Sequence, residues 1–146
     1  MSLTATVKDA VKAAMRAKEK ERLSALRLIT AEFKKVEVDE RIEVDDARAL
    51  QILDKMCKQR RDSIQQYQDA GREELAAVEQ AEIDVISEFL PEAMSDDELA
   101  QLVTDAIAQS GAAGMQDMGK VMGILKPKVQ GRADMGQVSQ MVKSQL

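Results

Sequence analysis

The sequence predicts an all-α protein, built as an N-terminal four-helix bundle of hairpins followed by a smaller three-helix module. Residues of high helix propensity dominate it: Ala, Leu, Met, Glu, Gln, Lys and Arg. Apolar residues recur at the spacing of amphipathic helices along most of the 146 residues. Strand-forming residues are scarce, since aromatic side chains make up 2% of the chain and β-branched residues form no strand-like run.

The first two helices are separated by a charged stretch. Ser2 or Thr4 is expected to cap the first helix, because either side chain can accept a hydrogen bond from a free backbone N–H. Residues 16–22 (RAKEKER) carry no apolar face, so they are expected to form the first turn. The second helix is expected to end between Asp39 and Glu43. The two apolar stripes are Leu3, Val7, Val11, Ala14 and Met15, then Leu23, Leu26, Ile29, Phe33 and Val36.

Two further helices complete the N-terminal part. Asp45 and Asp46 are expected to cap the third helix, where acidic groups also complement the helix dipole. Gly71 is expected to terminate it, and Pro91 to stop the fourth helix. The predicted buried stripes are Ala49, Ile52, Leu53, Met56, Ile64 and Tyr67, then Leu75, Val78, Ile83, Ile86, Phe89 and Leu90.

The acidic stretch after Pro91 is the best candidate boundary, and we expect domains at 1–92 and 93–146. Ser95 and Glu98 have the spacing of a capping box, which opens a helix that ends at 110–111. A short helix follows, in which Gly119 and Gly123 are expected to let a neighbour approach closely. We expect 126–132 (KPKVQGR) to be a loop, broken by its proline and glycine, and Asp134 with Gln137 to open the last helix.

The sequence shows no catalytic, metal or cofactor site. It has no histidine, which is the commonest general base and a frequent metal ligand. Cys57 is the single cysteine and is expected to be a buried structural thiol, with a redox role as the alternative. No glycine-rich phosphate loop and no apolar run long enough for a membrane span occur. We therefore expect no cofactor, no membrane partner and a cytoplasmic location.

Two basic clusters are the candidate binding residues. The smaller comprises Lys58, Arg60 and Arg61. The other lies in 115–146, where five basic and two acidic residues give +3 within a chain of formal net charge −5. Basic side chains beside free N–H groups at a helix start can hold phosphates. Ordinary solvation of surface lysines is the competing interpretation.

The motifs resemble the YqeY family along nearly the whole chain. The most specific match is the tail: 117–123 (DMGKVMG), 126–134 (KPKVQGRAD) and Val138-Ser139. Four N-terminal segments agree with the family pattern: 22–27 (RLSALR), 58–64 (KQRRDSI), 70–75 (AGREEL) and 89–92 (FLPE).

The family's C-terminal module is similar to the tail domain of the B subunit of tRNA-dependent amidotransferase (GatB). This resemblance implies a GatB-tail-like three-helix module that engages tRNA or structured RNA. The implied contact residues are Lys120, Lys126, Lys128, Gly131 and Arg132, with Asp134 as a helix cap. The same resemblance associates the chain with glutamine-dependent carbon–nitrogen ligase chemistry. The domain of the B subunit that binds ATP and performs transamidation has no counterpart in this sequence.

Three functions remain open. The first is a non-catalytic RNA-binding accessory module, whose affinity would depend on phosphate contacts. The second is a helical protein–protein adaptor that uses adaptable methionine-rich surfaces. The third is a subunit in amide transfer, which would need an amidotransferase or another protein partner to supply the ATP and glutaminase chemistry.

Overall fold

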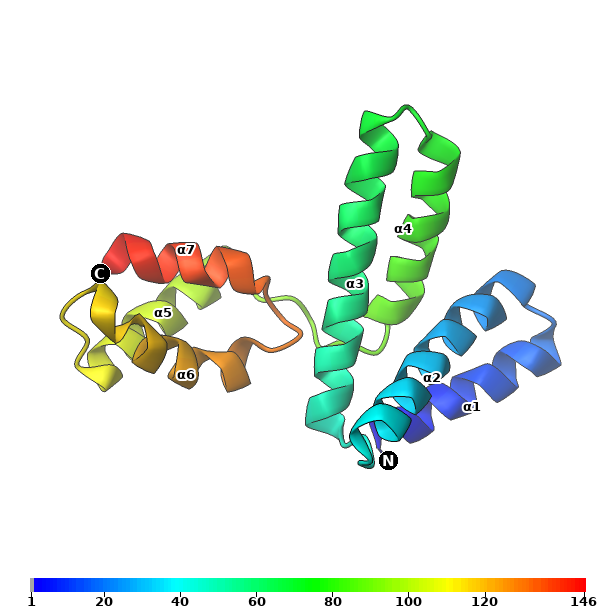
Figure 1. The fold of residues 1–146 in the computed structure, drawn as a ribbon, viewed down its shortest axis with the longest axis horizontal. Coiled ribbons are helices and arrows are strands. Elements are labelled where there is room, and N and C mark those ends of the chain that lie inside the picture. The colour runs from blue at the N-terminus through cyan, green and yellow to red at the C-terminus, as the bar shows by residue number, and fades with distance from the viewer. Residues whose placement is uncertain (1) are drawn as a thin grey trace. The chain divides into compact units, whose positions relative to one another are not determined.

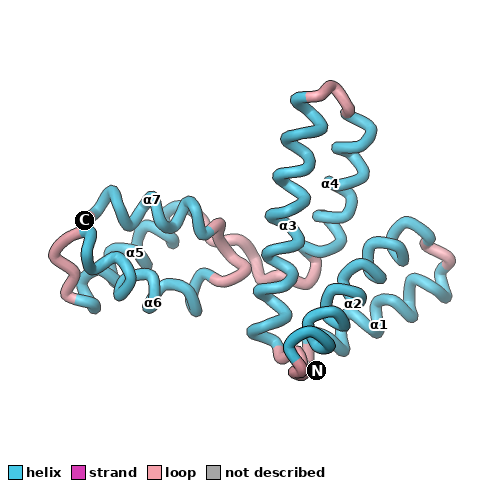
Figure 2. The backbone as a smooth tube through the Cα atoms, viewed as in Figure 1, coloured by secondary structure: helices cyan, strands magenta, loops and turns pink. Residues whose placement is uncertain are grey.

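The computed structural model describes residues 2–146, and within them it contains seven α-helices, one short 3₁₀ helix and no strand (Figures 1 and 2). The predicted all-α class is therefore confirmed. The chain forms two compact units, Met1–Leu90 (unit 1) and Pro91–Leu146 (unit 2). The sequence placed this division two residues later, between Glu92 and Ala93.

Unit 1 consists of two antiparallel hairpins. The first pairs α1 (Leu3–Ala17) with α2 (Lys20–Glu40), and the second pairs α3 (Asp46–Asp69) with α4 (Glu73–Ser87). Figure 1 shows that the two hairpins lie close together near the end of α4 and diverge toward the turns that close them. Their shared core is apolar: its fully buried members include Val7, Leu26, Ile29, Ala49, Leu53, Cys57 and Ile86.

The predicted caps of unit 1 are present. The Ser2 hydroxyl accepts from the backbone N–H of Ala5 at 3.2 Å, and the Asp45 carboxylate accepts from that of Arg48 at 2.8 Å. Asp46 has a further role, because its carboxylate accepts from the backbone N–H of Leu3 at 2.8 Å. This bond ties the start of α1 to the start of α3, 43 residues away in the sequence.

Two local features of unit 1 differ from the expectation in detail. The first turn lies inside the predicted stretch 16–22 but is shorter, because Lys18 takes a left-handed conformation with φ of 58° and reverses the chain within two residues. The expected apolar stripes were also partly misplaced: Met15 is 52% exposed and Val78 57% exposed, and Leu75 is exposed as well. In α4, the small Ala76 is buried beside the α3–α4 interface instead, and the helix ends at Ser87, three residues before Leu90.

Unit 2 has its own core. It comprises α5 (Asp96–Ser110), the 3₁₀ helix η1 (Met115–Asp117), α6 (Met118–Val129) and α7 (Met135–Gln145). Ser95 caps α5 as expected, accepting from the backbone N–H of Glu98 at 3.2 Å. The fully buried side chains are Leu99, Val103, Val121, Leu125, Val129, Val138 and Val142, to which Ala106 adds a small contribution.

The loop expected over 126–132 was wrong, because α6 continues through Pro127 to Val129. Pro127 removes the hydrogen bond to the carbonyl group of Gly123, but the following turn still forms, since the N–H of Gln130 donates to the carbonyl of Lys126 at 3.0 Å. Lys126 and Lys128 consequently lie on a helix, and the turn is confined to the residues between Val129 and Met135. Asp134 caps α7 through the N–H of Gly136, whereas Gln137 donates to Asp96 at 3.2 Å and takes no part in the cap.

Candidate functional site

The lysines of α6 lie on its solvent-exposed side, where the helical spacing of about 100° per residue sets Lys126 and Lys128 toward opposite edges. Lys120, Lys126 and Lys128 are all exposed, and the helix contains no acidic residue. Within residues 2–146, none of the three ammonium groups lies within 4.0 Å of a carboxylate. The neighbouring α5 is the opposite, with four acidic residues and no basic one. The positive charge of unit 2 is therefore concentrated on α6, and its charges are free to meet an anionic partner.

Two glycines lie on the same helix beside these lysines. Gly119 and Gly123 are exposed, and a Cβ atom added at either position would meet no atom within 4 Å. The sequence led us to expect a close neighbour at these glycines, and within the described chain there is none. Each interior glycine disfavours a helix by up to about 1 kcal/mol relative to alanine. No internal contact explains that loss of stability at this face.

Pro127 interrupts the hydrogen bonding of the same helix at one position. It has no N–H to donate to the carbonyl group of Gly123, the residue four positions earlier. The ring of Pro127 lies where that N–H would be, so this one hydrogen bond of the helix is not made. The spacing of Gly123 and Pro127 in the sequence already indicates this missing hydrogen bond.

Gly131 and Arg132 do not join the lysine face, because both are committed to the turn before α7. Gly131 has a φ of 76°, a conformation that glycine adopts without the steric penalty of a side chain. Arg132 donates from Nε to the carbonyl oxygen of Glu92 at 2.9 Å, and its own carbonyl accepts from Met94 at 3.0 Å. Its guanidinium also lies 3.5 Å from the carboxylate of Glu98. Arg132 thus fastens the segment before α5 to the turn before α7.

Replacing Arg132 with alanine is expected to lower the free energy of unfolding of unit 2 by about 1–2 kcal/mol, because a half-buried charge-assisted contact is lost. Chemical denaturation monitored by helical circular dichroism measures this. Lys143→Ala, which removes one exposed charge from the same unit, is the matched control and should change stability little. Equal stability of the Arg132 variant and wild type would contradict the structural role.

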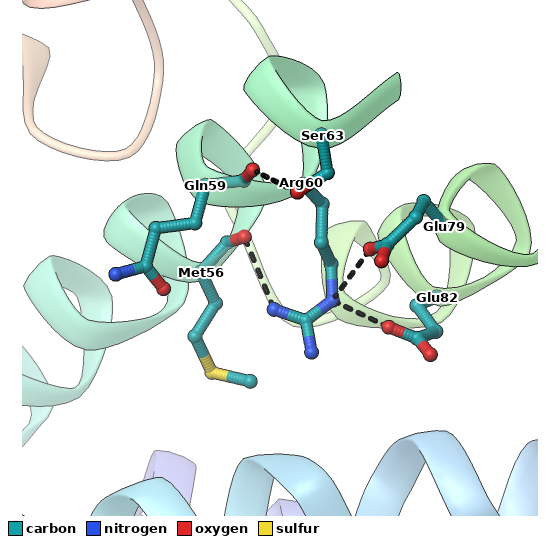
Figure 3. A network of polar contacts seen from close by, with 6 residues as sticks. All are labelled: Met56, Gln59, Arg60, Ser63, Glu79 and Glu82. Atoms are coloured by element: carbon teal, nitrogen blue, oxygen red, sulfur yellow. Dashed lines mark hydrogen bonds and ion pairs between the residues drawn. The ribbon is translucent and has the colours of Figure 1, made fainter. Parts of the chain in front are cut away.

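The second basic cluster, Lys58, Arg60 and Arg61, is divided by the structure. Lys58 and Arg61 are exposed, but the Arg60 side chain is only 15% exposed. Figure 3 shows its guanidinium between the two helices of the second hairpin, where Nε lies 2.7 Å from Glu82 and 3.9 Å from Glu79. It also donates to the carbonyl oxygen of Met56 at 3.2 Å. Arg60 therefore stabilises the α3–α4 hairpin, and its charge is already neutralised.

Glu79 is the carboxylate of this group whose charged form is disfavoured by its surroundings. Partial burial and the neighbouring carboxylate of Glu82 raise the pKa of Glu79, and Arg60 offsets this only in part. The folded state then holds this proton more tightly than the unfolded chain does. The contribution of Glu79 to stability is therefore present below the ordinary glutamate pKa and is lost as pH rises through the raised pKa.

We expect Glu79→Gln to raise the melting temperature at about pH 7 and to lose that advantage below about pH 4, where glutamate is protonated. Thermal melts followed by circular dichroism across this range test the sign. Glu82→Gln is the control and should lower the melting temperature at about pH 7, because Arg60 loses its 2.7 Å partner. A lower melting temperature for Glu79→Gln at neutral pH would contradict the assignment.

Cys57 is fully buried in the core of unit 1. Desolvation raises the pKa of its thiol, although Arg61 and a hydrogen bond with Ser87 act in the opposite direction. A buried, protonated thiol is a poor nucleophile, so the structural interpretation of Cys57 holds. In the described part of the chain, no group of three His, Cys, Asp or Glu side chains is placed to hold a metal ion. None of the helices over residues 2–146 has the length and hydropathy to span a membrane.

Known proteins give this chain a family. The model of the family described as Yqey-like protein matches residues 4–146. A protein of Pyrenophora tritici-repentis named altered inheritance of mitochondria protein 41, mitochondrial, is 30% identical over 125 residues, which are 84% of this chain and 68% of that protein. The protein of the same name from Meyerozyma guilliermondii is 32% identical over 126 residues, covering 82% of this chain and 65% of its own length. Both the extent of the family match and these identities lead to one conclusion: the chain belongs to the YqeY-like protein family.

Proposed function

We propose that this YqeY-like protein is a non-catalytic accessory module that binds tRNA, or RNA of similar structure, through the exposed face of α6. The observation that carries the proposal is the set of three lysines on one helix, all exposed and all without a carboxylate partner in the described chain. Phosphate groups are the natural partners of such a surface, because neutralising them releases bound counterions. The sequence resemblance of the YqeY family's C-terminal module to the tail domain of tRNA-dependent amidotransferase supports the same class of ligand.

The shape of α6 favours a polynucleotide over a small anion. Gly119 and Gly123 leave the helix surface flat between the lysines, so a backbone could approach it closely. An RNA ligand would differ from DNA at this surface in its A-form shape and in its ribose 2′-hydroxyl groups. Tyr67 is the only tyrosine and lies in unit 1, and neither phenylalanine is in unit 2. Recognition would therefore use phosphate, ribose and shape, without aromatic stacking on bases.

The chain would contribute binding and positioning only. A part in amide transfer would require a partner, such as an amidotransferase, that supplies ATP and glutamine chemistry. The methionine-rich adaptor surface that the sequence raised as an alternative has little support, because Met56 is buried and the strongly exposed Met15 and Met115 belong to different units. Any adaptor surface must therefore be sought elsewhere in the molecule.

The direct test is a titration of ¹⁵N-labelled full-length protein with unlabelled bulk tRNA, followed by amide resonances. We expect the largest shifts and broadening at Lys120, Gly123 and Lys126, with little change at the acidic start of α5. Broadening confined to unit 1, or no change at all at low salt, would contradict the proposal. Double-stranded DNA of equal charge is the matched ligand control and should bind more weakly, because it lacks the 2′-hydroxyl.

The glycines allow a sharper test, because stability and binding should change in opposite directions. The double variant Gly119→Ala and Gly123→Ala should be more stable, by up to about 1 kcal/mol at Gly123 and less at Gly119 in the first turn, since alanine is the better helix former and its Cβ meets no atom outside its own helix turns within 4 Å. Its added methyl groups should nevertheless weaken tRNA binding. Denaturation and tRNA titration of the same preparation measure both effects. Unchanged RNA affinity in the stabilised variant would show that RNA does not approach this face.

A further inference from the structure

Unit 1 contains an open groove that the proposed RNA contact does not use. It lies between the N-terminal half of α2 and the length of α4, on the side where the two hairpins diverge in Figure 1, and its volume is about 550 Å³. Six of its nine lining residues are small or apolar, and the other three are charged: Ser24, Ala25, Ala77, Val78, Ala81 and Val85, then Glu21, Arg22 and Glu82. Val78 is 57% exposed, which is unusual for a valine on a helix that also contributes to a core. This apolar surface has no partner within the described chain.

The walls have the geometry that a helix needs. Ala77 and Ala81 are one turn apart on α4 and both are exposed, while Ala25 lies across the groove on α2. Alanine side chains allow a packed helix to approach closely, and Val78 and Val85 supply apolar contacts along the same wall. Grooves between two helices bind amphipathic helices through apolar side chains spaced at i, i+3, i+4 and i+7.

The rim of the groove is acidic. Glu21 and Glu82 line it, and Glu19, Glu79 and Glu88 lie beside them on the same two helices and their ends. Two guanidinium groups pair with four of these five carboxylates: Arg22, which itself lines the groove, with Glu19 and Glu88, and Arg60 with Glu79 and Glu82. Lys18 and Lys20 flank Glu19 at the α1–α2 turn, outside the lining, and offset part of the charge at that end of the groove. α4 itself has five acidic residues and no basic one.

We propose that this groove is the docking site for an amphipathic helix of a partner protein, with an apolar stripe flanked by lysine or arginine. The apolar walls of the groove would contact the apolar stripe of the helix, and its acidic rim would attract the flanking basic residues. The same rim disfavours the other occupants. RNA phosphates would be repelled, and a symmetric contact between two copies would set one acidic rim against the other.

The probe is a fluorescein-labelled peptide of about 18 residues, or five helical turns, with leucine at i, i+4, i+7 and i+11 and lysine on both sides. We expect saturable binding to the full-length protein, measured by fluorescence anisotropy. A peptide with glutamate in place of each lysine should bind much more weakly, because the rim repels it. Absence of saturable binding by the lysine peptide, or equal binding by the two peptides, would overturn the proposal.

The variants locate the contact. Val78→Lys with Ala81→Lys should lower the peptide affinity roughly tenfold or more, because both side chains lie in the groove wall. Both positions are exposed, so the fold should be retained, and helical circular dichroism checks this. Gln80→Lys makes the same kind of change at an exposed position of α4 outside the lining and should bind as wild type. Equal affinity of the double variant and wild type would overturn the proposal, as would a dimer in light scattering that Ala81→Lys dissociates.

Discussion

Replacing Leu125 with alanine is expected to lower the free energy of unfolding of unit 2 by about 2–5 kcal/mol. Leu125 is fully buried, and the core it belongs to has only eight buried residues, most of them the smaller valine. The deleted methyl groups would leave a cavity that so small a core cannot refill. Because folded domains are stable by only about 5–15 kcal/mol, and small ones by less, this loss is a large share of the total.

Hydrogen exchange resolved by residue is the appropriate measurement, because it reports each unit separately. Amides of α5, α6 and α7 should lose protection in the Leu125 variant, while those of α3 should change little, since its side chains belong to a different core cluster. Leu53→Ala is the matched control in unit 1, where the opposite pattern is expected. Equal loss of protection in both units by the Leu125 variant would show that they unfold as one.

Replacing Lys120, Lys126 and Lys128 together with alanine is expected to lower tRNA affinity roughly tenfold to a hundredfold at about 0.1 M salt. Each lysine that neutralises a phosphate contributes a released counterion, and each loss should make the salt dependence shallower by about one. The fold should be retained, since all three side chains are exposed and none lies within 4.0 Å of a carboxylate in the described chain. Filter binding or anisotropy with labelled tRNA measures the change.

The matched control removes the same charge from unit 1. Lys8, Lys12 and Lys34 are exposed lysines of α1 and α2, and their triple replacement with alanine changes the net charge equally. Affinity should then fall only slightly, through the long-range field. If both triple variants lose affinity to the same extent, binding depends on net charge alone and α6 has no special part in it.

The sequence was sufficient for the fold class and for most helix limits, because caps and breakers act locally. Ser2, Asp45 and Ser95 each cap the helix that they were predicted to cap, and Gly71 closes the α3–α4 hairpin with a φ of 71°. Burial was harder to predict, because a periodic stripe does not specify which neighbour covers it. Leu75 and Val78 fit the stripe of α4, but their side of the helix lies toward open groove and solvent.

The candidate site shows the same limit. Composition identified every basic residue of the tail, yet it could not separate the cations that are free from those that are used inside the protein. Arg132 and Arg60 have partners far away in the sequence, at Glu92 and Glu82, and only the fold reveals those contacts. The expectation that Pro127 would break the helix was also wrong, because the turn after the lost hydrogen bond still forms through Gln130 and Lys126. Because this segment is helical, Lys126 and Lys128 lie at fixed positions on α6.

The central claim is that α6 binds RNA through phosphate contacts. Its most direct test is the equilibrium affinity of the full-length protein for labelled bulk tRNA across a series of salt concentrations. Three lysine–phosphate contacts predict a log–log slope of about −2 to −3, depending on whether single- or double-stranded RNA is bound. Absence of binding even at low salt, or an affinity that does not change with salt, would contradict the account.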